Sequence, residues 1–319
     1  MSLRLGLLST ADINAKLVTG AREAEEVDVV AVASRDQGRA RAHADELGVP
    51  RALGSYEELL DDGEVDAVYI SLPNGMHVDW SIRALDAGKH VLCEKPLSRH
   101  PEEVERAFDA AERNGRVLAE TFMWRHHPQA VRLRELAGEL GELRLVRGAF
   151  SFSLSEPGNI RLAADLDGGA LMDVGCYCVS GARFLLGEPD QVTAHSHGDA
   201  VDVRFVGTMS FASGALATFD CGFDMPPRDE LEVIGSEGSL FLDDPWHSRT
   251  PVIERRAPDG TLQDIEIEEV DAYGCELADF ERACAGEAEH PFGRDDAVAQ
   301  ARAIAALYEA ADSGRAVSP

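Results

Sequence analysis

The chain opens with an apolar run and a turn of small residues, Leu3-Arg4-Leu5-Gly6-Leu7-Leu8-Ser9-Thr10-Ala11. The leucines predict a short buried strand, and the segment Asp12–Ala24 that follows has helical spacing. A tight turn between a strand and a helix brings the end of the strand to the helix N-terminus, where amide groups and the helix dipole favour an anion. The stretch therefore predicts the first strand–helix unit of a doubly wound sheet.

Strands and helices keep alternating through the first 120 residues. Short apolar runs predict further strands, at Val27–Ala33, Ala67–Leu72, His90–Cys93 and Val117–Ala119. Helical spacing lies between them, at Asp36–Leu47, Val78–Ala87 and Pro101–Asn114. Because strands buried on both faces and separated by helices are typical of parallel sheets, we expect an α/β Rossmann domain over residues 1–121.

The pattern changes after residue 121. Helices are expected at Gln129–Leu140 and Ala170–Leu186, with a strand at Leu143–Leu154 between them. From Gln191 to Ile267, short turns separate successive strands, which is typical of an antiparallel meander. We expect residues 122–319 to form an α+β substrate-binding and oligomerisation domain with a large, mainly antiparallel open sheet. Its last helix could pack back on the first domain.

The charge balance excludes some classes of partner. The chain has 58 acidic and 30 basic residues, a formal net charge of −28, and only three lysines: Lys16, Lys89 and Lys95. So much negative charge argues against nucleic acids and anionic membranes as partners. It is typical either of the surface of salt-adapted proteins or of an arginine-rich genome, and composition leaves both open.

Location and metal content are predicted from absent patterns. We find no uninterrupted apolar run of the ~18–20 residues that a membrane span needs, and no signal-peptide cleavage site after the first strand. The six cysteines are scattered without zinc spacing. His195 and His197 share one strand face but have no nearby carboxylate pattern. We therefore expect a cytoplasmic protein without a metal site.

The first turn is a candidate dinucleotide loop. A Rossmann loop places small residues where the backbone approaches a pyrophosphate. Here Gly6 is followed by Ser9 and Ala11 in the other two small-residue positions, with Thr10 and Ile13 beside them. An ordinary tight turn would have the same pattern, but in its context the loop favours a nicotinamide dinucleotide.

The end of the second strand indicates which dinucleotide. NAD-preferring sites place a carboxylate there to bind the adenosine ribose. This chain has Ser34 and then Arg35, and a hydroxyl beside a guanidinium suits a 2′-phosphate. Arg39 could supply further positive charge. A solvated arginine at a helix start is the alternative interpretation. We predict NADP(H) as cofactor, with NAD possible.

Several motifs resemble those of the Gfo/Idh/MocA oxidoreductases. They are Tyr69-Ile70-Ser71-Leu72-Pro73-Asn74 with His77, Ala87-Gly88-Lys89-His90-Val91-Leu92-Cys93-Glu94-Lys95-Pro96, the segment Glu120–Pro128, and Gly168–Tyr177. The Glu-Lys-Pro that follows a strand is the most specific part. The resemblance is dense to about residue 190 and looser beyond it. It is closest to the branch that contains dihydrodiol dehydrogenase, sugar 1-dehydrogenases and glucose–fructose oxidoreductase.

The resemblance implies roles for individual residues. Lys95 matches the catalytic lysine, near the nicotinamide and the reacting oxygen. Tyr177 stands where many members have a histidine and would be the proton donor and acceptor, with Asp173 as its catalytic neighbour. The implied cofactor contacts are Leu72, Pro73, Asn74, His77, Glu94, Lys95 and Arg125. The implied substrate contacts are Lys95, Trp124, Asp173, Tyr177 and Tyr273.

The chemistry requires such a pair in any case. A phenol is a poor base at its usual pKa of about 10, and a nearby ammonium lowers that pKa. Asp173 and Tyr177 are four residues apart, so a helix presents both on one face. Lys95 stands out in a chain that otherwise uses arginine, because only lysine readily changes protonation. A core tyrosine is the alternative interpretation of Tyr177.

These observations predict an NADP-dependent dehydrogenase or reductase that acts on CH–OH groups. Its small-molecule substrate would be a sugar, a polyol or a vicinal diol. The alternatives are a non-catalytic regulator or sensor of the same fold, or an enzyme with a tightly held cofactor that couples two half-reactions. Family members associate through the open sheet of the second domain, so the resemblance implies a homodimer or homotetramer.

Overall fold

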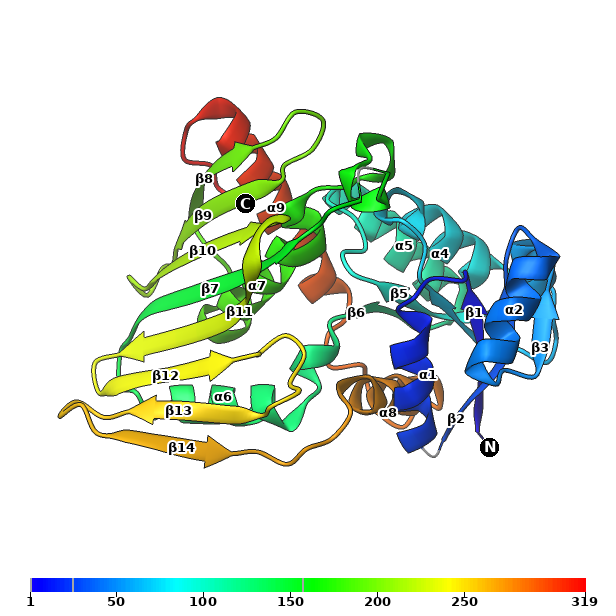
Figure 1. Cartoon of the computed structure of the whole chain (residues 1–319), viewed down its shortest axis with the longest axis horizontal. Coiled ribbons are helices and arrows are strands. Elements are labelled where there is room, and N and C mark those ends of the chain that lie inside the picture. Colours follow the sequence, from blue (N-terminus) through cyan, green and yellow to red (C-terminus); the bar gives the residue numbers. More distant parts are fainter. Residues whose placement is uncertain (1, 25, 157) are drawn as a thin grey trace. The chain divides into compact units, whose positions relative to one another are not determined.

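The computed structural model describes residues 2–24, 26–156 and 158–319, which form two compact units (Figure 1). Unit 1 consists of Met1–Met123 and Val270–Val298, and unit 2 of Trp124–Glu269 and Ala299–Pro319. The sequence-based division at residue 121 assigned residues 122–319 to the second domain, with only the last helix packing back on the first. The structure instead assigns Val270–Val298 to unit 1, because helix α8 (Ala272–Cys284) packs against helix α1 (Asn14–Glu23).

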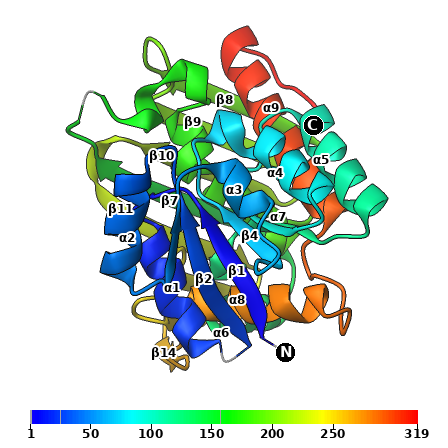
Figure 2. The ribbon, with the colours of Figure 1, turned by 90° about the vertical axis from the view of Figure 1, so that its right-hand side faces the viewer.

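Unit 1 is built on a parallel six-stranded sheet in the order β3-β2-β1-β4-β5-β6. The strands β1 and β2, which carry the first leucine and valine runs, lie side by side in Figure 2. The chain order reverses between β1 and β4, where ligands of such sheets bind. The predicted parallel α/β fold is confirmed, while the short strand β3 and the short helix at Tyr56–Leu60 were not predicted. The strands are Leu3–Leu8 (β1), Val27–Ala33 (β2), Arg51–Leu53 (β3), Ala67–Ile70 (β4), His90–Glu94 (β5) and Leu118–Thr121 (β6).

Local signals begin and end the helices of unit 1. Asp36 caps α2 by accepting a hydrogen bond from the Arg39 amide at 2.8 Å, and Ser55 caps α3 in the same way. Gly115 ends α5 with φ +61°, which glycine adopts readily. The helices not yet located are α2 (Gln37–Leu47), α3 (Tyr56–Leu60), α4 (His77–Asp86) and α5 (Pro101–Asn114), with a 3₁₀ turn at Asn74–Met76.

Close packing of α1 on α8 depends on Gly20. A Cβ atom at this position would lie 2.6 Å from Asp271 Oδ1 and 2.6 Å from the Gly274 amide nitrogen, which together form the α8 cap. Gly20→Ala should therefore lower the free energy of unfolding by about 1–3 kcal/mol, despite the better helix propensity of alanine. Urea unfolding of this variant is the measurement. Gly63→Ala is the matched control, because a Cβ there meets nothing within 4 Å. Equal stability of both variants would contradict the prediction.

Unit 2 contains an eight-stranded sheet in the order β14-β13-β12-β11-β7-β10-β9-β8. Every neighbouring pair is antiparallel except β7 with β10, so the predicted open, mainly antiparallel sheet is confirmed. The strands are Leu143–Ser153 (β7), Gln191–His197 (β8), Arg204–Ser210 (β9), Leu216–Gly222 (β10), Asp224–Gly235 (β11), Gly238–Asp243 (β12), Val252–Arg256 (β13) and Leu262–Glu266 (β14).

Helices cover one face of this sheet. Helix α7 (Cys176–Leu186) lies on β7 and β10, helix α6 (Pro128–Ala137) on β12 and β13, and Tyr308 of α9 (Arg294–Ser313) stacks its ring edge-on against Phe205. The single helix predicted at Ala170–Leu186 is wrong in one respect. Its first turn, Leu171–Gly175, is a π-helix, a rare form that is frequent at functional sites.

The apolar segment that contains α7 has the length and mean hydropathy, 1.2, of a membrane span. In the described part of the chain it is the one such segment, Ala164–Leu186, and 78% of its apolar window is buried inside the protein. Gly181 shows how closely this helix is enclosed, because a Cβ there would lie 2.8 Å from the Trp246 ring. A single, largely buried helix of this kind is typical of a protein core.

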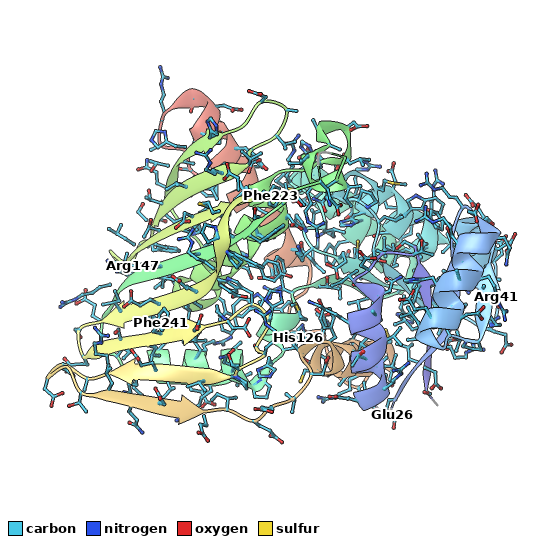
Figure 3. The ribbon with its side chains drawn as sticks, viewed as in Figure 1. Glu26, Arg41, His126, Arg147, Phe223 and Phe241 are labelled. Atoms are coloured by element: carbon cyan, nitrogen blue, oxygen red, sulfur yellow. The ribbon has the colours of Figure 1, made fainter. Side chains whose placement is uncertain are left out.

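The other face of the second sheet is open and strongly charged. Arg147 on β7 bonds Glu232 on β11 at 3.2 Å, and Arg228 pairs with Asp220. These side chains line a shallow hollow of about 540 Å³ that also includes Phe241. Figure 3 labels Arg147 and Phe241 on this sheet. The face combines apolar side chains with ion pairs.

Candidate functional site

A buried polar network fixes the turn between β1 and α1. The Ser9 hydroxyl lies 2.7 Å from the Ser71 hydroxyl and accepts a hydrogen bond from the Ala11 amide at 3.1 Å. Asn14 closes the network, because its amide donates to the Ser9 carbonyl at 3.0 Å and its Oδ1 accepts from Ser71 at 2.7 Å. Ser9, Asn14 and Ser71 are all buried. Side-chain hydrogen bonds therefore hold the loop where glycines are expected.

Gly6 lies inside β1 rather than in the turn. It pairs with Ala31 and Val68, and a Cβ there would lie 2.8 Å from Leu59 Cδ1. The glycine is thus required by the close approach of α3 to the strand, which is a packing role beneath the loop.

The N-terminus of α1 suits an anionic group. Its first turn holds no acidic residue, and its N-cap, Ile13, offers no side-chain acceptor. Among the described residues, none accepts a hydrogen bond from the amides of Asp12 and Ile13. Uncapped amides at the positive end of a helix dipole are what a pyrophosphate binds. The residues present therefore fit the phosphates of a dinucleotide.

Two arginines lie beside this loop at the start of α2. Arg39 donates a hydrogen bond to the Thr10 hydroxyl at 3.2 Å, which links α2 to the predicted cofactor loop. Ser34 is buried at the end of β2, and its hydroxyl accepts from the Asp36 amide at 3.3 Å. Arg35 is exposed. The structure thus brings Thr10, Ser34, Arg35 and Arg39 together at the edge of the sheet.

Lys95 follows directly after β5. Its amide lies 3.3 Å from the carboxylate of Glu94, and that carboxylate also accepts a short hydrogen bond from the Tyr69 hydroxyl. Burial raises the pKa of Glu94 above its usual range, and the nearby Lys95 charge opposes that rise. Tyr273 of α8 lies in the same environment, since its charge contributes to a raised pKa of Tyr69. The end of β5 and the buried Glu94 carboxylate thus hold the Lys95 backbone in place.

His77 holds two segments of this site together. It is fully buried, with Nδ1 2.9 Å from the Pro96 carbonyl and Nε2 2.7 Å from the Leu72 carbonyl. Both ring nitrogens therefore face backbone oxygens, so His77 is placed to position Leu72 and Pro96, and its role as a cofactor contact stays a prediction. Burial lowers the pKa of this histidine. The implied contacts Pro73 and Asn74 lie in the loop between β4 and α4.

The second group of site residues lies in unit 2, around Tyr177 at the start of α7. Its ring contacts Phe150 of β7 edge-on, with centroids 5.4 Å apart, and lies 6.0 Å from Trp246. Tyr177 is 7% exposed. Its phenol is thus surrounded by aromatic side chains, where a nearby charge acts more strongly than in water.

Asp173 lies in the π-helical turn that precedes Tyr177. Its Oδ2 accepts a hydrogen bond from Arg161 Nε at 2.6 Å. Arg161 also lies over the Phe152 ring. The sequence indicated Asp173 but not its partner, because Arg161 comes from an irregular segment with no periodic pattern.

Three implied contacts lie in less accessible places. Trp124 is 1% exposed and packs edge-on against Trp246 and Phe184, and its role as a substrate contact stays a prediction. Arg125 and Tyr273 are also buried. Lys95 and Tyr177 fall in different units, so their pairing stays a prediction.

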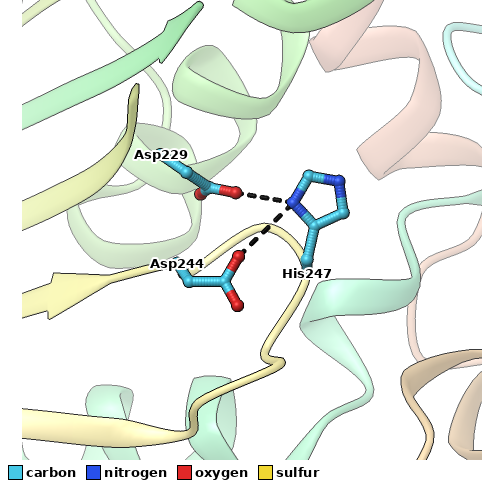
Figure 4. Close-up of side chains that lie close together, drawn as sticks. All are labelled: Asp229, Asp244 and His247. Carbon is cyan, nitrogen blue, oxygen red and sulfur yellow. Dashed lines mark hydrogen bonds and ion pairs between the residues drawn. The ribbon is translucent and has the colours of Figure 1, made fainter. Parts of the chain in front are cut away.

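The structure contains one cluster that the sequence did not indicate, Asp229, Asp244 and His247 (Figure 4). One ligand atom from each lies within 4.8 Å of the others. His247 Nδ1 lies 2.6 Å from Asp229 Oδ2 and 3.5 Å from Asp244 Oδ1. Arg249 binds Asp244 through its Nε and its terminal nitrogen. Asp229 lies on β11, and Asp244 and His247 lie in the segment after β12, so the pairing of these two strands brings the three together.

Comparison with known families assigns both units. Residues 9–122 match the family described as "Oxidoreductase family, NAD-binding Rossmann fold". Residues 129–241 match the GFO/IDH/MocA C-terminal domain.

Individual relatives agree with these matches. The chain is 42% identical to D-xylose 1-dehydrogenase (NADP(+)) 2 of Haloferax volcanii, over 99% of each chain. It is 33% identical to trans-1,2-dihydrobenzene-1,2-diol dehydrogenase of Danio rerio, covering 79% of this chain and 77% of the relative. A 3-ketoreductase from Actinomadura kijaniata, solved with NADP and TDP-benzene, superposes with a TM-score of 0.91 and 30% identity, covering 97% of this chain and 98% of that one. Further structures of that enzyme carry a lysine-to-alanine or a tyrosine-to-phenylalanine substitution. The chain therefore belongs to the Gfo/Idh/MocA family of oxidoreductases.

Proposed function

We propose that the protein is an NADP-dependent oxidoreductase that interconverts a carbinol and a carbonyl group of a sugar, polyol or vicinal diol. The observation that carries the proposal is the placement of the ionisable groups. Lys95 directly follows the carboxyl end of β5 in unit 1, and Asp173 and Tyr177 lie on successive helical turns in unit 2. The same two residue types, lysine and tyrosine, are those substituted in the 3-ketoreductase structures.

The proposed chemistry divides between the cofactor and the chain. The nicotinamide, when bound, accepts or returns the hydride. In the oxidative direction the Tyr177 phenolate takes the proton of the substrate hydroxyl, and in the reductive direction the phenol gives it back. The Lys95 ammonium stabilises the phenolate and the developing alkoxide, because a nearby positive charge favours the anionic form of each. Asp173, fixed by Arg161, orients the substrate hydroxyls.

NADP is proposed over NAD because Arg39 reaches Thr10 and Arg35 follows Ser34. Arg35→Ala and Arg39→Ala should each raise the KM for NADP roughly tenfold to hundredfold and leave the KM for NAD unchanged, since a charged hydrogen bond to phosphate is lost. The control is Arg41→Ala on the same helix, at a position labelled in Figure 3. The Arg41 guanidinium pairs with Asp45 at 3.1 Å. Steady-state assays with both cofactors measure the effect. An unchanged NADP to NAD ratio in both variants would contradict the assignment.

The test of the function itself is cofactor reduction. Purified protein and NADP should give rising absorbance at 340 nm with at least one compound of a panel that contains D-xylose, other aldoses and a trans-dihydrodiol. A sensor would bind the cofactor and give no turnover with any of them. An enzyme with a tightly held cofactor would give turnover only when a second, oxidised sugar is present.

Assembly and location remain proposals. We propose that the open face of the second sheet is covered in a homodimer or homotetramer, since it combines apolar side chains with charge pairs. Light scattering after size exclusion would measure the mass of the assembly. A cytoplasmic location stays a prediction from the sequence.

A further inference from the structure

We propose that His247, oriented by Asp229, is a substrate-binding residue whose Nε2 contacts a hydroxyl group of the polyhydroxy substrate. This inference rests on the proposed function and adds a specificity-determining residue to it. Both residues lie in unit 2, outside the sequence motifs that resemble the oxidoreductase family.

The hydrogen bonds of the pair leave one ring nitrogen available. His247 Nδ1 lies 2.6 Å from Asp229 Oδ2, a distance that places a proton on Nδ1 and holds the ring in one orientation. No described residue bonds Nε2, and the side chain is 24% exposed. Nε2, on the opposite side of the ring from Asp229, can therefore exchange a hydrogen bond with a substrate hydroxyl group.

The carboxylate of the pair is itself fixed. Asp229 accepts a second hydrogen bond from the Trp246 amide at 3.2 Å and is largely buried, with 12% of its side chain exposed. Burial raises the pKa of Asp229, and the contact with His247 opposes that rise. In an exposed ion pair both side chains can change rotamer when a ligand binds. The Asp229 carboxylate is largely buried and accepts two hydrogen bonds, so it holds the His247 ring in one orientation.

Aromatic contacts connect this imidazole to the proposed proton donor. Phe150 stacks edge-on against His247, with centroids 5.5 Å apart, and edge-on against Tyr177 at 5.4 Å. Trp246 contacts Tyr177 and is the neighbour of His247 in the chain. Phe150 and Asp229 pair across β7 and β11, so they project from the same face of the sheet. Tyr177 and His247 thus contact the same Phe150 ring on one face of the sheet, which places them in one aromatic cluster.

The same three side chains satisfy the spacing of a metal site, but their charges do not favour one. The Arg249 guanidinium binds Asp244 in two places and lies 3.7 Å from Asp229. A divalent cation would have to displace it or tolerate its repulsion. The Nδ1 proton shared with Asp229 also occupies the lone pair that a metal would need.

Two variants of His247 separate substrate binding from structural support. His247→Asn keeps an amide group near the position of Nδ1 and removes Nε2, whereas His247→Ala removes both. If Nε2 binds substrate, both variants should raise the KM for the preferred sugar about tenfold and leave the dissociation constant of NADP unchanged. His195→Asn, on the exposed strand β8, is the matched control and should change neither constant.

Deoxy sugars identify the contact. A deoxy sugar that lacks the hydroxyl bound by His247 should have a higher KM than the parent sugar with the wild type. With His247→Asn the two sugars should have the same KM, because the free-energy losses from removing the two partners of one contact do not add. The dissociation constant of the sugar from the NADP complex, followed by tryptophan fluorescence, gives the same comparison without turnover.

Each outcome decides the inference. A wild-type-like KM in His247→Asn, with a raised KM only in His247→Ala, would assign the ring a structural role and overturn it. Tight binding of zinc or nickel that both variants abolish would also overturn it, in favour of a metal. If the wild type neither turns over nor binds any sugar, the proposed function and this inference both fail. If the wild type is active and both variants keep its KM for the sugar, only the inference fails.

Discussion

Lys95→Met is expected to lower kcat by about 10³-fold or more and to leave NADP binding within about twofold of the wild type. Methionine keeps the length and much of the volume of the lysine side chain but carries no charge. The Lys95 amide contacts the Glu94 carboxylate, and the next residue, Pro96, is held by His77, so these backbone contacts do not depend on the side chain that is replaced. The loss should therefore be chemical and not structural. Stopped-flow absorbance for turnover and fluorescence titration for NADP measure the two quantities.

The chain provides an unusually clean control for this experiment. Of its two other lysines, Lys89 is buried and donates to the carbonyls of Asp62 and Val65, so its replacement would destabilise unit 1. Lys16 is exposed on α1, and Lys16→Met should keep full activity. Full activity in Lys95→Met would remove Lys95 from the mechanism. Loss of NADP binding together with turnover would instead make it a cofactor ligand.

Much of the fold could be predicted because it is encoded locally. The buried strands of unit 1 are short apolar runs bounded by glycine, proline or helix caps, and each element begins and ends close to such a signal. The turns of unit 2 carry glycines with positive φ, such as Gly214 and Gly260, which mark a meander. Strand β3 was missed because it has only three residues and pairs with β2 alone.

The site was predictable only where one segment contains it. The sequence indicated Lys95, Asp173 and Tyr177 because they stand in motifs. It did not indicate that Arg161 binds Asp173, 12 residues away in an irregular segment, or that Asp229 binds His247, 18 residues away. The second contact depends on the pairing of β11 with β12, which brings Asp229 beside the loop after β12. The role of Gly6 was also hidden, because only the packing of α3 on β1 reveals why a side chain is excluded there.

Tyr177→Phe is expected to lower kcat by about 10²–10⁴-fold while the protein stays folded. Phenylalanine keeps the edge-on contacts with Phe150 and the contact with Trp246, so the aromatic cluster loses only one oxygen atom. Without the hydroxyl, the substrate proton must pass to water. The rate should then rise with hydroxide concentration and lose the pH dependence that an enzymic base imposes. A pH–rate profile of the variant measures this change.

The control and a double variant make the test specific. Tyr56→Phe removes a hydroxyl from a buried tyrosine that packs on Trp80 in unit 1, and it should keep wild-type kinetics. Equal pH profiles in Tyr177→Phe and the wild type would exclude Tyr177 as the proton carrier. If Lys95 acts mainly by stabilising the Tyr177 phenolate, Lys95→Met and Tyr177→Phe remove one function twice, and the double variant should be little slower than the slower single one. If the two losses multiply instead, Lys95 acts on the substrate oxygen independently of the tyrosine. The double variant thus distinguishes a proton relay from two separate contributions to the same transition state.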